Sequence, residues 1–253
     1  MAEKKYTVEP FSVEKIMSAD GALLNKYVEL INCLFEVDIT EIRQKVKEAR
    51  SQNKQELSVL ACLLYCYGQT LHKFKESYAL RGKGNKLYFF DEADAFFPVD
   101  IRIGDKKLLW CKLIKRINLK SPYELEQDIR AAKAMTKTIT KAEKFFFAMP
   151  FFVRNWYYNY MMGNPLVRKG YGGNVYFTSM IHRGNTDFLL KIVPQHFHTT
   201  GMFVGTYKQQ IDNNGIEKSI LGITLSLDHI ISDADLLAKL AREFVNQVDN
   251  FKL

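Results

Sequence analysis

A strand, a turn and a helix are predicted in residues 223–248, ITLSLDHIISDADLLAKLAREFVNQV. The β-rich run ends at His229, and Asp233 follows four residues later at the start of a helix expected over about 233–248. A strand terminus holds a side chain firmly but lets it face a cleft, where a neutral imidazole can take a proton from a thiol or hydroxyl. Asp233 would fix the turn. Because His-x3-Asp is common, the pattern alone is more often structural than catalytic.

The chain before this stretch predicts a mixed fold. An N-terminal arm and helical pattern fill residues 1–31, and a Gly/Lys-rich turn at 81–86 separates two helices from the β-rich runs that follow. The elements follow no strict βαβ order, so we expect an α+β two-layer sandwich of a mixed sheet and helices, forming one domain over 1–253. The expected strands are 34–37, 86–90, 95–103, 106–117 (a hairpin around Gly104-Asp105), 175–179, 202–208 and 220–228, and the expected helices are 41–50 with Thr40 as N-cap, 56–71, 121–140 and 233–248.

The composition indicates a globular domain and argues against a membrane-spanning or disulfide-rich protein. The chain has 253 residues, 47% hydrophobic and 25% charged, as in soluble globular domains. Its longest apolar run, 145–153, is far shorter than the roughly 20 residues that span a bilayer, and no secretory signal is visible at the N-terminus. We therefore expect a cytoplasmic protein with no membrane partner. Four cysteines without a CxxC pair predict reduced thiols, with Cys62 and Cys66 packed in the core rather than bound to metal.

The net charge, 36 − 28 = +8, permits a nucleic-acid partner, but the basic residues are scattered and no nucleic-acid-binding signature accompanies them. Nucleic acid is therefore the least favoured partner. A positive field also suits small polyanions, such as the phosphates of coenzyme A. The glycines fit no Walker or Rossmann pattern.

Two other groups of residues have competing interpretations. The aromatic segment 145–173 could form core, subunit interface or a substrate wall, with core or interface favoured. His196 and His198 have the spacing of some metal ligands, but a solvated loop is favoured because the segment has no third ligand. His72 is interpreted as a helix-end residue.

Residues 223–248 resemble the C-terminal part of the acyltransferase component of 2-oxo acid dehydrogenase complexes (dihydrolipoamide acyltransferase), and of chloramphenicol acetyltransferase, which has the same fold. Both families carry HxxxDG between a strand and the last helix, matched here by His229 and Asp233, with Asp228 before the histidine. Three more segments agree in order: LFEVDITEIRQKVKEA, YFTSMIHRGNTDFLLKIVP and MFVGTYK. The resemblance spans about residues 10–250 and implies a chloramphenicol acetyltransferase-like fold.

The resemblance also implies a chemistry. His229 would be the general base, Ser179, with Thr178 as the less favoured alternative, would stabilise the oxyanion, and Asp233 would be structural, paired with a basic residue for which Lys15 is the candidate. Thr178, Asp228 and His182 would contribute to substrate binding. Acyl-coenzyme A is the implied substrate, and no metal and no lipoyl group of the chain's own is required. The match begins near Met1, so we expect a catalytic domain without a lipoyl domain.

Some residues depart from the family pattern. Ala234 replaces the glycine after the aspartate and could strain the histidine turn. Ile230 replaces an arginine, and His182 with Arg183 occupies a turn that is usually glycine-rich, which points to a different acceptor.

The family's assembly implies a homotrimer with active sites between subunits. The acceptor would be a small molecule or a lipoylated protein. The alternative is a non-catalytic trimeric scaffold or binding module that kept the fold.

Overall fold

A computed structural model describes residues 13–52, 56–103, 106–135 and 140–253. The strands are β1 (Leu30–Asp38), β2 (Leu80–Arg81), β3 (Leu87–Tyr88), β4 (Ala95–Ile103), β5 (Lys106–Ile114), β6 (Val175–Ser179), β7 (Thr200–Ile211) and β8 (Glu217–Asp228). The α-helices are α1 (Val13–Leu23), α2 (Thr40–Ser51), α3 (Val59–Lys73), α4 (Pro122–Lys133), α5 (Lys141–Ala148), α6 (Phe151–Gly163), α7 (Pro165–Gly172) and α8 (Ala234–Asp249). Short 3-10 helices are η1 (Leu24–Tyr27), η2 (Lys75–Tyr78), η3 (Lys83–Asn85) and η4 (Ile181–Arg183).

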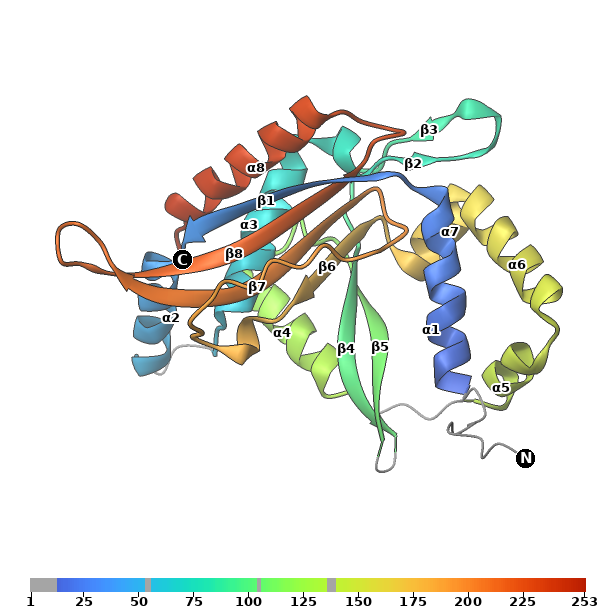
Figure 1. The fold of residues 1–253 in the computed structure, drawn as a ribbon, viewed down its shortest axis with the longest axis horizontal. Helices are drawn as coiled ribbons and strands as arrows, with labels where there is room; N and C mark the ends of the chain where they lie inside the picture. Colours follow the sequence, from blue (N-terminus) through green and yellow to red (C-terminus); the bar gives the residue numbers. More distant parts are fainter. Residues whose placement is uncertain (1–12, 53–55, 104–105, 136–139) are drawn as a thin grey trace, which may run out of the picture.

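A six-stranded sheet in the order β1-β8-β7-β6-β4-β5 forms one layer, and β2 with β3 forms a small separate sheet (Figure 1). The pairs β7–β6 and β6–β4 are parallel and the others in the large sheet are antiparallel. Alternate residues of β8, from Leu221 to Leu227, are buried against helices α2, α3, α4 and α8. The predicted two-layer α+β fold with a mixed sheet is confirmed.

Helix α3 runs through the core, which explains its nearly uniform apolar sequence. Ser58 caps it by accepting a hydrogen bond from the amide of Ala61. Cys62 and Cys66 are fully buried and free, as predicted, and burial raises the pKa of the Cys62 thiol to about 12. These thiols are therefore protonated and serve as packing groups.

Several predicted boundaries change. The helix predicted over 121–140 ends at Lys133, and a new helix begins at Lys141 with its own capping box at Thr140. The strand predicted over 34–37 extends to Leu30–Asp38, because β1 pairs with β8 along its whole length. Thr40 is the first residue of α2 rather than its N-cap. Gly104-Asp105 lies outside the described residues, but β4 and β5 pair as the predicted hairpin.

The aromatic segment forms α5, α6 and α7 at one edge of the molecule, beside α1 (Figure 1). Met161 and Met162 pack with Leu24 and Phe197 in a second, small core. Many of the other aromatic side chains are exposed in the single chain. Of the two favoured interpretations, core packing does not hold for those residues, and a subunit interface stays a prediction. Within the described ranges, no helix combines the length and the apolar character needed to cross a bilayer.

Candidate active site

The turn after β8 exposes His229 at the surface, and hydrogen bonds to the residue before β1 fix the turn. The amide of His229 donates to the carbonyl of Glu29 (2.7 Å). The carboxylate of Asp228 is 3% exposed and accepts hydrogen bonds from the amides of Glu29 (3.0 Å) and Ile230 (3.2 Å). Burial raises the pKa of this carboxyl group. These bonds attach Asp228 to the histidine turn, and its expected part in substrate binding stays a prediction.

The imidazole of His229 has a defined orientation. Its Nδ1 lies 3.0 Å from the carbonyl oxygen of Ser232, three residues further along the turn. Because a carbonyl can only accept a hydrogen bond, Nδ1 is the donor, so in the neutral ring Nε2 holds the free lone pair. An exposed imidazole in this tautomer is suited to act as a general base.

Asp233 lies beside this turn as the N-cap of α8, where its carboxylate accepts from the amide of Leu236 (2.9 Å). It thus fixes the start of the helix that follows the histidine. Pairing of Asp233 with Lys15 stays a prediction. Among the described residues other than glycine, only Arg116 has a positive φ, so Ala234 introduces no left-handed strain.

Ser179 ends β6, on the helix-covered face of the sheet. Its Oγ accepts a hydrogen bond from the amide of Ile181 (3.1 Å). The hydroxyl hydrogen is therefore available to donate to a ligand. Thr178 points to the opposite face, where it hydrogen-bonds to Tyr176, and His182 is exposed in η4.

Within one chain, His229 follows the end of β8, whereas Ser179 ends β6 beside the middle of β7 and β8. The register places Ser179 beside Val204, and Val204 beside Ile223, six residues before His229. With about 3.3 Å per residue and about 4.8 Å between strands, the two residues are roughly 20 Å apart. A single chain therefore does not bring the predicted base and oxyanion donor together.

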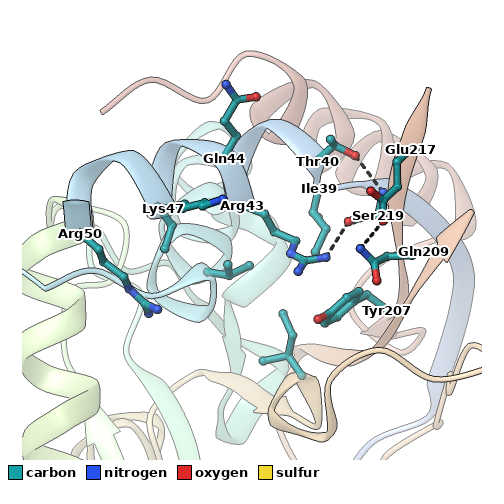
Figure 2. Close-up of a pocket in the computed structure, with 13 residues that line it drawn as sticks. Ile39, Thr40, Arg43, Gln44, Lys47, Arg50, Tyr207, Gln209, Glu217 and Ser219 are labelled. Carbon is teal, nitrogen blue, oxygen red and sulfur yellow. Dashed lines mark hydrogen bonds between the residues drawn. The ribbon is translucent and has the colours of Figure 1, made fainter. Parts of the chain in front are cut away.

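A cavity of about 600 Å³ lies between helix α2 and strands β7 and β8 (Figure 2). Helix α2 contributes three cations to it, Arg43, Lys47 and Arg50, and β8 contributes the carboxylate of Glu217. Ile181, whose amide donates to Ser179 Oγ, also lines the cavity. Ser179 itself does not line this mainly cationic pocket but is bonded to a residue of its wall.

The pocket cations are partly held in place. Arg43 donates to Ser219 Oγ (2.7 Å) and its guanidinium carbon lies 4.2 Å from the centre of the Tyr207 ring. The Nε of Arg50 donates to the carbonyl of Leu57 (2.9 Å). Lys47 is exposed, and its flexible ammonium suits a phosphate. In the helix expected over 41–50, cations at positions i, i+4 and i+7 are a sequence signal of one charged face, which the predicted site residues did not include.

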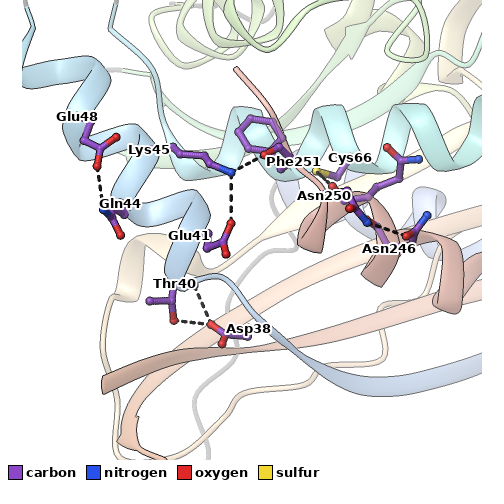
Figure 3. A network of polar contacts seen from close by, with 11 residues as sticks. Asp38, Thr40, Glu41, Gln44, Lys45, Glu48, Cys66, Asn246, Asn250 and Phe251 are labelled. Atoms are coloured by element: carbon purple, nitrogen blue, oxygen red, sulfur yellow. Dashed lines mark hydrogen bonds and ion pairs between the residues drawn. The ribbon is translucent and has the colours of Figure 1, made fainter. Parts of the chain in front are cut away.

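Contacts on the other side fix helix α2 against the C-terminus (Figure 3). The Nζ of Lys45 donates to the carbonyl of Phe251 (2.6 Å) and pairs with Glu41 (3.3 Å). Asp38 accepts hydrogen bonds from the amide and hydroxyl of Thr40, which anchors the start of the helix. The pocket wall is therefore a fixed element.

His196 and His198 are not in a solvated loop, and that prediction is wrong. Both are buried, and His196 Nε2 lies 2.6 Å from Ser226 Oγ while His198 Nε2 lies 2.7 Å from the carbonyl of Gly172. Burial lowers the pKa of His196 to about 3 and lowers that of His198 as well. In the described ranges, no group of three or more His, Cys, Asp or Glu residues could hold a metal ion.

No protein-family model matches the sequence, and no curated protein is significantly similar to it. Solved structures do match. A probable dihydrolipoamide acetyltransferase from Listeria monocytogenes is 16% identical, with a TM-score of 0.69 over 99% of this chain and 97% of its own. The dihydrolipoamide acetyltransferase of Azotobacter vinelandii, in which a serine, a histidine and an asparagine were investigated for roles in catalysis, is 16% identical with a TM-score of 0.69, over 97% and 92% of the two chains.

A chloramphenicol acetyltransferase is 12% identical, with a TM-score of 0.55 over 94% of this chain and 97% of its own. These similarities show that the chain has the fold of acyltransferase catalytic domains. They confirm the resemblance inferred from the sequence at the level of fold.

Proposed function

We propose that this protein is a coenzyme A-dependent acyltransferase that moves an acyl group between a coenzyme A thioester and a thiol or hydroxyl acceptor. The observation that carries the proposal is the orientation of His229, whose Nδ1 is bonded to the Ser232 carbonyl while Nε2 stays free at the surface. The acyltransferase fold supports it, as does a serine with an available hydroxyl hydrogen beside a cationic pocket.

The reaction follows from these groups. Nε2 of His229 takes the proton of the attacking thiol or hydroxyl, and the resulting nucleophile adds to the thioester carbonyl. The Ser179 hydroxyl donates a hydrogen bond to the tetrahedral oxyanion. The intermediate then collapses, the carbon–sulfur bond breaks, and the leaving thiolate takes the proton back from Nε2.

The active site requires two copies of the chain. Because His229 and Ser179 are roughly 20 Å apart on one sheet, a complete site needs His229 from one copy and Ser179 from another. A cyclic homotrimer would provide three such sites between subunits.

The cationic pocket is the proposed site for the phosphates of coenzyme A. Arg43, Lys47 and Arg50 offer positive charge on one helix face, and their pocket reaches Ile181 next to Ser179. Phosphates bound on α2 would leave the thioester directed toward the serine hydroxyl.

Replacing His229 with Ala tests the proposal. Wild-type protein should release coenzyme A from acetyl-coenzyme A with at least one member of a panel of dihydrolipoamide, chloramphenicol, simple alcohols and amines. Removal of the base should lower this rate at least a hundredfold. The exposed His72 gives a matched control, because His72→Ala should keep the wild-type rate. Full turnover by the His229 variant would reject the mechanism, and a wild-type protein inactive with every acceptor would favour the trimeric scaffold.

Lys47→Ala tests the phosphate site. We expect the KM for acetyl-coenzyme A to rise about five- to tenfold with little change in kcat, because the lysine binds a part of the substrate remote from the reaction. Lys239→Ala is the control, since Lys239 is an exposed lysine on α8 paired with Asp235. The KM and kcat of both variants are measured by steady-state kinetics at two salt concentrations, since salt weakens contacts between cations and phosphates. An unchanged KM for Lys47→Ala would mean that the phosphates bind elsewhere.

A further inference from the structure

The outer face of helices α5 and α6 carries a set of exposed aromatic side chains. Phe152, Trp156 and Tyr160 are spaced by four residues and so share one face of α6. Phe152 and Trp156 are 72% and 70% exposed, and Phe145 on α5 is 68% exposed. We name Phe145, Phe151, Phe152, Trp156 and Tyr160 the aromatic face. Helices α5 and α6, which carry it, lie at the edge of the molecule away from α2 (Figure 1).

The opposite side of α6 is firmly attached to the rest of the protein. Arg154 forms a buried ion pair with Asp20 of α1 (2.7 Å) and also donates to the carbonyl of Met149 at the corner between α5 and α6. Tyr158 adds a hydrogen bond to Asp20 (3.0 Å). The aromatic face is thus presented by a fixed helix pair, so its exposure is not a result of a loosely packed helix.

The charge around this face is mainly positive. From Lys144 to Thr186 the sequence has no aspartate or glutamate. Exposed Lys141 and Lys144 lie on α5 with Phe145, and exposed Lys26 donates to Asn155 of α6 (3.3 Å). Asp20 is paired with Arg154, while Glu143 accepts from Thr140 in the α5 capping box and keeps its negative charge.

We propose that the aromatic face docks on the surface of an anionic phospholipid membrane. Tryptophan, tyrosine and phenylalanine side chains insert at the boundary between headgroups and acyl chains, and neighbouring lysines are attracted to anionic headgroups. The contact is peripheral. It departs from the expectation of no membrane partner, which considered only a spanning segment.

A second copy of the chain fits this face less well. Two copies that met face to face here would bring their exposed Lys141 and Lys144 side chains together. Lysine is also depleted in protein interfaces, whereas it flanks membrane-binding helices.

Vesicle flotation tests the proposal with full-length protein. We expect binding to phosphatidylglycerol/phosphatidylcholine vesicles, at least tenfold weaker binding to pure phosphatidylcholine, and at least tenfold weaker binding of the Phe152→Ser/Trp156→Ser variant. The matched control is Phe89→Ser/Phe188→Ser, which removes two similarly exposed phenylalanines elsewhere and should bind like wild type. Wild-type protein that does not float with anionic vesicles would overturn the proposal, as would a serine variant that binds normally.

Tryptophan fluorescence gives a readout that leaves the aromatic face intact. The chain has two tryptophans, so Trp110→Phe leaves Trp156 as the sole reporter. Its emission should shift to shorter wavelength on adding anionic vesicles, and an unchanged spectrum would contradict insertion. A different outcome would identify an interface between copies. In that case the wild-type protein binds no vesicles, and the Phe152→Ser/Trp156→Ser variant has a smaller assembly mass by light scattering than wild type. The membrane proposal would then be wrong.

Discussion

The five histidines of this chain show how strongly the environment of a single residue decides its chemistry. His229 is exposed with its Nδ1 bonded to a carbonyl, which leaves Nε2 able to accept a proton. His196 and His198 are buried among aromatic rings and are kept neutral by burial. The same side chain is a candidate base in one place and a packing group in another.

Burial of these two histidines makes stability depend on pH. An unfolded histidine takes up a proton below about pH 6.5, whereas burial lowers the pKa of His196 in the folded protein to about 3. The unfolded state therefore binds more protons between these values, and stability falls as the pH falls. Each histidine should contribute a slope of about 1.4 kcal/mol per pH unit in the middle of its window, at about pH 5 for His196, where the unfolded side chain is protonated and the folded one is not.

His196→Gln should remove about half of this slope, since Gln can keep a hydrogen bond to Ser226 but does not titrate. Urea unfolding at pH 7, 6 and 5 measures the free energy of unfolding for both proteins. His72→Gln, at an exposed position, should leave the wild-type slope. If the free energy of unfolding falls equally with pH in wild type and in His196→Gln, burial of His196 does not cause the acid sensitivity.

At the scale of elements, packing between segments can require a residue that is a poor helix former, as Gly68 in α3 shows. The sequence of α3 predicts a buried helix, and its contact with the segment after β5 explains why Gly68 occurs within it. A Cβ on Gly68 would lie 2.2 Å from the carbonyl oxygen of Ile117. Glycine is used here because two backbones approach closely.

Gly68→Ala should therefore destabilise the protein by about 2–4 kcal/mol, although alanine is normally the better helix former. Gly170→Ala in α7 is the matched control, because a Cβ there meets no atom within 4 Å. That variant should be neutral or stabilised by up to about 1 kcal/mol. Chemical denaturation measures the free energy of unfolding of wild type and both variants. If Gly68→Ala were as stable as Gly170→Ala, the backbone around Ile117 would relax easily to admit the Cβ.

At the scale of the whole molecule, the topology separates the two proposed catalytic residues. Strand β8 runs antiparallel to β7, and β6 runs parallel to β7, so the ends of β6 and β8 point in opposite directions. The end of β8 carries the proposed base and the end of β6 carries the proposed oxyanion donor. Under the proposed function, activity therefore depends on assembly.

Mixing two inactive variants tests this dependence. His229→Ala and Ser179→Ala should each be inactive, but after co-refolding at equal concentrations one site in four should pair an intact His229 with an intact Ser179. Coenzyme A release should then recover to about a quarter of the wild-type rate. No recovery, in mixtures shown by mass to contain both chains, would indicate that each chain contains its own site.

The sequence alone predicted the mixed α+β fold, the buried α3, the β4–β5 hairpin and the strand–turn–helix that carries His229. These features are local, because apolar periodicity and capping residues act over a few positions. Only the tertiary structure placed Ser179 far from His229, buried His196 and His198, and turned the cations of α2 toward a cavity. Such features depend on contacts between residues distant in the sequence, which local patterns do not specify.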